Sequence, residues 1–247
     1  FTGSGGFAAT LLHGTSEGMV EAKVNVPDGV WDFYSLTAFT ISDNVTGLVL
    51  VEGTPDVAAA KAEIPGAGGK FAGATSMLAW FRNRTDIVEL RMSDADVSNV
   101  TSFALFVFGA SNLQVLETGG WNPVSAESFR LFIENTQVST LDVSNWSTAS
   151  ATTFERFARS SNLTTVITEG GTGNPFADSP ATDYTDAFTS TNLDQASIDN
   201  ILVRIEQAGT SNGTFDQSNG SAPSATGEAA ITALRGRGWT VTVTGGF

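Results

Sequence analysis

The chain has 247 residues, with 26 acidic and 12 basic side chains that give a net charge of −14. Its single histidine and the lack of cysteine exclude disulfides, thiolate metal sites, a cysteine nucleophile and any site that needs two imidazoles from one chain. The negative charge argues against binding to nucleic-acid phosphates, and no apolar run approaches the length of a membrane span. With 41% hydrophobic residues, the chain is too apolar for a disordered segment and can fill a core.

Residues 1–69 are predicted to form a β-rich N-terminal unit. Apolar residues alternate with polar ones in 20–26, which is typical of a half-buried strand. Further strands are expected at 31–40 and 48–51. A short helix is predicted over 54–61, because Thr54 is a good cap and Pro55 suits the first helical position. The glycine-rich stretch 66–69 marks the end of the unit.

The first residues are predicted to bind a partner chain. The sequence begins at Phe1 without the basic start and apolar core of a signal peptide, so we expect it to belong to a longer chain. Phe1, Phe7, Leu11 and Leu12 flank a glycine-rich arm that has little to pack against in its own unit. Because an unpaired strand or arm invites pairing, we expect another virion protein or another copy of this chain to complete it.

The middle of the chain repeats itself with a period of about 26 residues. The repeat is marked by aromatic or Met residues at spacings of 26, 26, 25 and 30: Met77, Phe103, Phe129, Phe154 and Tyr184. Three residues later come Trp80, Phe106, Phe132 and Phe157. A spacing of three keeps each pair on one face of a helical or turn segment, and the six Phe are predicted to form one continuous ladder inside the stacked repeats. Leu and Val positions further along, such as 141–143, predict short strands.

Two stretches carry a family resemblance. The run LDVSNWSTASATTFERF at 141–157 and the run DVSNVTSFALF at 96–106 resemble the BspA-like leucine-rich repeat of bacterial and phage surface proteins. The resemblance covers about 75–195 and implies a solenoid of four to five coils over 70–193. Two stretches depart from the repeat: Glu-Thr-Gly-Gly-Trp at 117–121 stands where the family has an Asp-containing strand, and 170–180 interrupts the fourth unit.

Residues 194–247 are predicted to form a C-terminal capping module. Asp194 can cap a helix with a helical apolar stripe at Ile198, Ile201, Leu202 and Ile205. A polar loop is expected over 209–220, a second helix from Ser224 to about Leu234, and a final strand over 239–244. This ending is similar to the tail of phage fibre and virion proteins. The expected fold class is therefore α+β: a small N-terminal β-rich domain, a BspA-like leucine-rich-repeat solenoid and a helix-helix-strand cap.

The candidate sites are few, and we expect no catalytic residue and no cofactor. Asp94 and Asp96 alternate like the start of a calcium loop, but Asn99 and Leu105 stand where such a loop needs Gly and Glu. Turn chemistry is therefore the favoured interpretation, with calcium as a weak alternative. We read His13 as a polar edge residue. Trp121 and Trp146 fall at turn positions, where we expect partial exposure and a weak contact with a host-surface glycan or protein.

These features lead to three hypotheses of function. The first is a non-enzymatic structural protein of a phage particle, a tail or head fibre or a capsid-decorating subunit at the virion surface. The second is a bacterial cell-surface adhesin, for which a wall anchor on the full-length chain would be diagnostic. The third is a polysaccharide-degrading enzyme. Paired carboxylates are its only basis, and among 26 acidic residues some pair falls close by chance.

Overall fold

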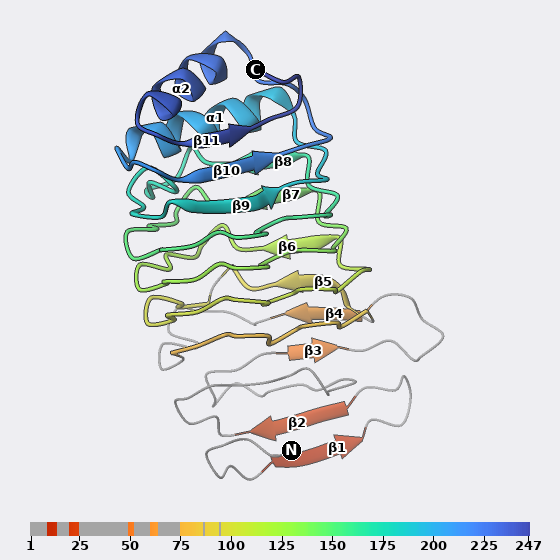
Figure 1. Cartoon of the computed structure of the whole chain (residues 1–247). Coiled ribbons are helices and arrows are strands. Elements are labelled where there is room, and N and C mark those ends of the chain that lie inside the picture. The colour runs from red at the N-terminus through yellow and green to blue at the C-terminus, as the bar shows by residue number, and fades with distance from the viewer. Residues whose placement is uncertain are drawn as a thin grey trace.

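The computed structural model describes residues 9–13, 20–24, 49–51, 60–63, 75–85, 87–93 and 95–247, with backbone pairing alone for the first four ranges. The described strands are β1 (Ala9–His13), β2 (Val20–Val24), β3 (Val49–Val51), β4 (Ala60–Glu63), β5 (Ile87–Arg91), β6 (Val115–Glu117), β7 (Thr140–Asp142), β8 (Thr165–Ile167), β9 (Asp183–Phe188), β10 (Thr214–Gln217) and β11 (Thr240–Thr242). The two described helices are α1 (Gln195–Gln207) and α2 (Ala225–Gly236). Figure 1 shows the short strands stacked in layers, with both helices at the C-terminal end.

The expected fold class is wrong. The described strands form four small sheets with the orders β1-β2, β3-β4-β5-β6, β7-β8 and β9-β10-β11, and most of the pairs are parallel. Instead of an α+β fold with a leucine-rich-repeat solenoid, the described residues show short parallel strands, two helices and no solenoid. The strand pairing stops between β6 and β7, which belong to different sheets, and there the Thr118 hydroxyl donates to the carbonyl of Asp142 at 2.9 Å.

The aromatic pairs lie on turn segments, which we define as 77–83, 103–109, 129–135 and 154–160. In 103–109, successive backbone N–H groups alternate between acceptors in the next layer and acceptors in the same segment. Leu105 and Val107 donate to the next layer, whereas Phe106 and Phe108 donate three residues back. Each segment therefore satisfies its backbone both within and between layers without forming a helix.

Left-handed backbone accompanies this alternation at two points of each layer, four residues apart. At the first point, five residues have φ between 55° and 61°: Ala79, Leu105, Leu131, Arg156 and Asp186. The second point falls at Asn83, Gly109, Asn135, Ser160 and Ser190. None of the first five is glycine, so each costs about 1–2 kcal/mol of backbone strain. The hydrogen bonds of Ala79, Leu105, Leu131 and Arg156 to the next layer hold this conformation.

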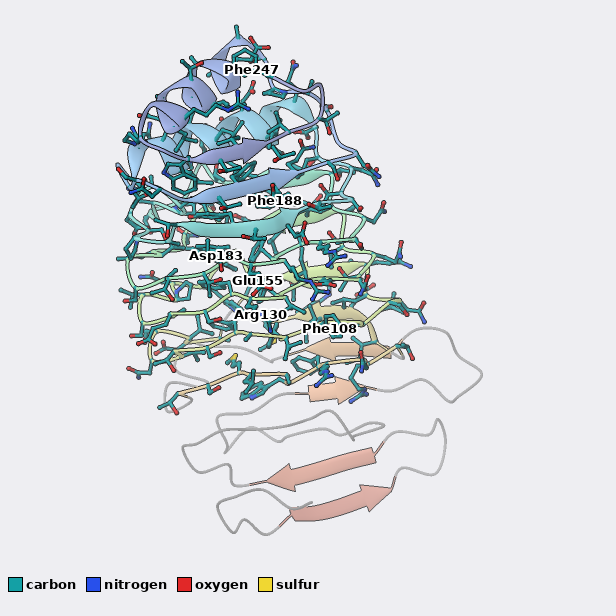
Figure 2. The ribbon with its side chains drawn as sticks, viewed as in Figure 1. Phe108, Arg130, Glu155, Asp183, Phe188 and Phe247 are labelled. Atoms are coloured by element: carbon teal, nitrogen blue, oxygen red, sulfur yellow. The ribbon has the colours of Figure 1, made fainter. Side chains whose placement is uncertain are left out.

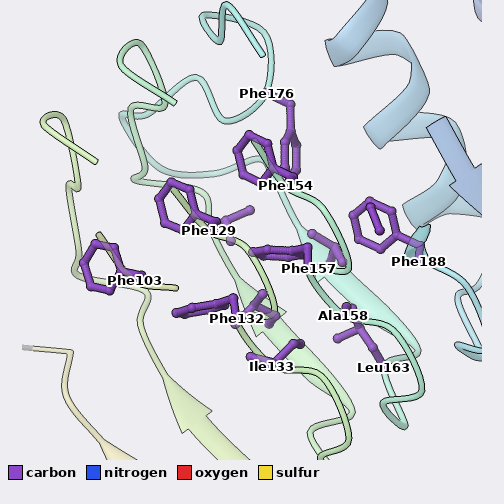
Figure 3. Close-up of a cluster of buried hydrophobic side chains, with 14 of the residues drawn as sticks. Phe103, Phe129, Phe132, Ile133, Phe154, Phe157, Ala158, Leu163, Phe176 and Phe188 are labelled. Atoms are coloured by element: carbon purple, nitrogen blue, oxygen red, sulfur yellow. The ribbon is translucent and has the colours of Figure 1, made fainter. Parts of the chain in front are cut away.

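The predicted Phe ladder is confirmed. All six rings are fully buried. One file stacks Phe103, Phe129 and Phe154 at 5.5 and 5.2 Å between centroids, and it continues to Tyr184 at 4.9 Å. A second file stacks Phe106, Phe132 and Phe157 at 5.6 and 5.4 Å. Figure 3 shows Phe103, Phe129 and Phe154 in a row, beside Phe132 and Phe157. Parallel strands are about 4.8 Å apart, so the rise of the layers itself places the rings at stacking distance.

In the N-terminal part, β2 and β3 confirm the strands predicted at 20–26 and 48–51. The prediction of a helix over 54–61 is wrong at its C-terminal end, because Ala60–Glu63 is a strand, β4, that pairs with both β3 and β5. Its cross-strand hydrogen bonds override the local helix signal. The pairing of β4 with β5 crosses the expected boundary at 69–70. The predicted strand at 31–40 and the glycine stretch 66–69 lie outside the described residues.

In the C-terminal part, α1 begins as predicted. The Asp194 carboxylate accepts a hydrogen bond from the Ser197 N–H at 2.7 Å, and the predicted stripe is buried. Helix α2 and strand β11 are also confirmed. The polar loop predicted over 209–220 is wrong in its middle, because Thr214–Gln217 forms the central strand β10 with Phe215 buried. One hydrophobic cluster extends from Met77 to Val243 and crosses the expected boundary at 193–194.

Candidate functional site

The predicted partner-binding arm is described only in part. Phe1 and Phe7 lie outside the described residues. Leu11 and Leu12 belong to β1, where their backbones pair with Ala22 and Glu21 of β2. The expected unpaired strand is therefore wrong for β1, because it has an antiparallel partner within its own unit.

The expected exposure of Trp121 and Trp146 is wrong. Their exposed fractions are 0% and 1%, and the two rings stack on each other at 6.1 Å. The indole N–H of Trp121 donates to the Met92 carbonyl at 2.6 Å, and that of Trp146 donates to the Thr118 carbonyl at 3.3 Å. Both tryptophans are thus core residues that join adjacent layers, and neither offers a ring to an external partner.

The calcium alternative gains no support from the described residues. Asp94 lies outside them. The Asp96 carboxylate accepts from the N–H and the hydroxyl of Ser98, at 3.0 and 2.7 Å, which is the turn chemistry that we favoured. Within the part of the chain that the structure describes, no group of three or more His, Cys, Asp or Glu side chains is arranged to hold a metal ion.

A hollow opens where the strand pairing stops, between β6 and β7, and we call it the β6–β7 hollow. Its volume is about 410 Å³. The residues that line it are Ser93, Gln114, Val115, Leu116, Glu117, Thr118, Gly119, Ser139, Thr140 and Asp142. They combine hydroxyl, amide and carboxylate groups with aliphatic surface from β6. Binding pockets of about 300–1,000 Å³ with a few convergent polar groups are typical of small-molecule sites.

Two neighbours position the Asp142 carboxylate in this hollow. Its Oδ1 atom accepts from the Ser144 N–H at 2.9 Å, which orients the group. Gly119 leaves room for the other oxygen, because a Cβ at that position would lie 2.7 Å from Asp142 Oδ2. A glycine in the preceding layer therefore lets the carboxylate lie close against the backbone of its neighbour.

Glu117 is held by an ion pair across the sheet. The Arg91 guanidinium contacts both Glu117 and Glu89, the latter at 3.1 Å. Because these side chains are between 19% and 41% exposed, water screens the pairs and they add little stability. Their effect is to fix the Glu117 carboxylate at the margin of the hollow. The Arg91 charge is already balanced by two carboxylates.

Three groups with shifted pKa values have structural explanations. Burial raises the pKa of the Tyr184 hydroxyl, which lies in the aromatic file. Burial alone would raise the pKa of Asp194, but hydrogen bonds from the N–H and hydroxyl of Ser197 and from Thr165 lower it overall. The hydrogen bond with Glu155 raises the pKa of Arg130. Figure 2 shows Arg130, Glu155 and Asp183 in successive layers.

The hollow was not predicted from the sequence. Glu117 and Asp142 are 25 residues apart, and only the stacking of layers brings them to one site. One signal was present in the sequence: the departure from the repeat at 117–121 coincides with the end of the strand pairing after β6 and includes Gly119. Where one repeat departs from the pattern, its part of the surface differs from the surfaces of the neighbouring repeats.

Comparison with protein-family models, curated proteins and solved structures found no match. The resemblance to BspA-like repeats and to phage fibre tails therefore stays a prediction. Neither α1 nor α2, the two helices described, is long and apolar enough to cross a membrane.

Proposed function

We propose that the chain is a non-enzymatic structural protein of a phage particle, a fibre or capsid-decorating subunit at the virion surface, and that it works by binding. The supporting observation is the continuous aromatic packing from Phe103 to Tyr184. Rings stacked across these adjacent layers make a rigid scaffold, and rigid scaffolds suit repeated surface display. The phage assignment itself rests on the resemblance of the sequence motifs.

Several acidic side chains serve the scaffold. Asp178 accepts from the hydroxyls of Ser147 and Thr148, both at 2.7 Å, and so joins two layers. Asp199 of α1 accepts from the Ser224 N–H at 2.9 Å, which fixes the start of α2. These carboxylates stabilise turns and helix ends, a structural use that fits a protein without a catalytic centre.

The partner is proposed to be another virion protein or another copy of this chain, bound through the N-terminal unit. The −14 charge keeps separate copies apart in solution until a specific contact overcomes their repulsion. The arm with Phe1 and Phe7 remains the proposed contact, and the described layers would project away from it.

The test is to locate the protein. Particles are purified by density gradient, washed in high salt, analysed by mass spectrometry, and labelled with gold-conjugated antibodies raised against the recombinant chain. We expect the chain in constant ratio to the major capsid protein, with gold at one kind of position. Recovery only in a bacterial envelope fraction would overturn the proposal in favour of the adhesin. Release of reducing sugar from a polysaccharide panel would overturn it in favour of the enzyme.

A further inference from the structure

The β6–β7 hollow differs chemically from the other strand junctions in the stack. Elsewhere, the residue after one strand donates its N–H to the next layer, as Met92 does to Glu117 at 3.2 Å and Val143 to Ile167 at 2.9 Å. Between β6 and β7 the Thr118 hydroxyl makes the contact with Asp142. The two strands belong to different sheets although they lie in successive layers (Figure 1). The edges that face each other are therefore available to a ligand.

The lining determines the charge of the ligand. The described residues of the hollow include two carboxylates, Glu117 and Asp142, and no cationic side chain. The nearby Arg91 is engaged by Glu89 and Glu117. A phosphate, sulfate or uronate would face net negative charge in this position, because the single Arg91 guanidinium is set against the carboxylates of Glu89, Glu117 and Asp142. The ligand must instead supply hydrogen-bond donors to the carboxylates.

The remaining lining determines its shape and polarity. Gln114, Ser139 and Thr140 offer both donors and acceptors, and Val115 presents aliphatic surface. A ring with hydroxyls at its edge and C–H groups on its face matches this combination. Hydrogen bonds from ligand hydroxyls to carboxylates are among the stronger neutral-to-charged contacts.

We infer that the β6–β7 hollow is a binding subsite for a neutral saccharide, with the Asp142 and Glu117 carboxylates accepting hydrogen bonds from its hydroxyls. This deepens the proposed function and rests on it for its biological meaning, since a particle-surface protein would use the subsite to contact a host glycan. The hollow is partly open to solvent, so we expect a dissociation constant of about 1 mM for one sugar unit. Repeated copies on a particle would strengthen binding through multivalency.

The experiment is an NMR titration of the ¹⁵N-labelled full chain with neutral hexoses, N-acetylhexosamines and their disaccharides, with glucuronate as the anionic comparison. We expect saturable shifts confined to 114–119 and 139–142 for at least one neutral sugar, and weaker binding of glucuronate. Absence of shifts at about 50 mM, some fifty times the expected constant, would overturn the inference. Shifts elsewhere, or equal binding of glucuronate, would also overturn it.

Matched variants test the two carboxylates. Asp142→Asn keeps an oxygen for the Ser144 N–H but loses the charge, and Glu117→Gln is its counterpart on β6. Each should weaken binding about tenfold. The control for the first is Asp96→Asn, whose carboxylate makes the same kind of turn with Ser98 outside the hollow. The control for the second is Glu155→Gln, an ion-paired and similarly exposed glutamate. Equal effects in variants and controls would contradict the assignment.

Gly119→Ala provides a test that leaves all charges in place. The new Cβ would displace the Asp142 carboxylate, so we expect weaker binding with an unchanged spectrum away from the hollow. Unchanged affinity would count against the role of Asp142. Failure of the sugar-binding inference can be distinguished from failure of the proposed function, because sugar binding is measured on the isolated chain. Binding without particle incorporation would leave the subsite standing, and incorporation without binding would leave only the structural role.

Discussion

The rings of Phe129 and Phe154 lie parallel, with 5.2 Å between their centroids and 4° between their planes. They occupy equivalent positions in adjacent layers, 25 residues apart. The same relation holds for Phe103 and Phe129, at 5.5 Å and 5°. Because the backbone rise and the ring spacing agree, each added layer extends the core without opening a void.

Phe132→Ala should lower the free energy of unfolding by about 3–5 kcal/mol, because it removes a fully buried ring that stacks on both Phe106 and Phe157. Reversible urea unfolding measures the change. Phe247→Ala is the control, since that ring is 42% exposed and its loss should cost less than about 0.5 kcal/mol. A loss below about 1 kcal/mol for Phe132→Ala would contradict its place in the core.

Trp121→Phe should destabilise the chain by about 0.5–1.5 kcal/mol, because it removes the indole N–H that bonds the Met92 carbonyl at 2.6 Å, while the Ala95 N–H still bonds that carbonyl at 3.0 Å. The measurement is again the midpoint and slope of urea unfolding. The same substitution at Trp146, whose bond to Thr118 is longer at 3.3 Å, should cost less. The reverse order would show that ring packing dominates over the hydrogen bonds.

Gly173→Ala should destabilise the chain by more than about 2 kcal/mol. A Cβ at this position would lie 2.3 Å from the Asn145 carbonyl carbon and 2.4 Å from the Trp146 nitrogen, both of which are backbone atoms. Gly236→Ala is the matched control, because nothing lies within 4 Å of its Cβ position at the end of α2. Its melting temperature should stay constant or rise slightly. Similar losses for both variants would refute the close approach of layers at Gly173.

Asp194→Ala should cost about 0.5–2 kcal/mol at pH 7, because it removes the N-cap of α1. The pKa of Asp194 is lowered in the folded chain from its ordinary value of 3.8. Its stabilising contribution is therefore complete above that value and is lost as the pH falls through the folded pKa. The difference between wild type and variant should shrink below about pH 4.

Unfolding free energies measured from pH 7 down to the acid limit test this linkage. Glu169→Ala, at an exposed position, is the control for the loss of one negative charge. A difference between wild type and Asp194→Ala that stays constant down to low pH would show that the carboxylate does not act through its charged form.

Local patterns determined several elements of this protein. The i, i+3, i+4 stripe from Ile198 to Ile205 and the cap at Asp194 are properties of neighbouring residues, and α1 forms as predicted. The period of about 26 residues placed the Phe ladder in one core, because residues at equivalent phases must stack. In both cases the decisive contacts repeat regularly along the chain.

The tertiary structure decided other features, which the local sequence patterns either did not predict or predicted wrongly. Trp121 and Trp146 are at turn positions but lie buried, because the next layer covers them. Leu105 and Leu131 have left-handed backbone conformations, which leucine disfavours, because hydrogen bonds between layers hold the backbone there. The β6–β7 hollow lies where two strands of successive layers are not paired, and there Thr118 bonds to Asp142 across the layers. These features depend on contacts about 25 residues apart, whose geometry is fixed by packing and not by the identity of adjacent side chains.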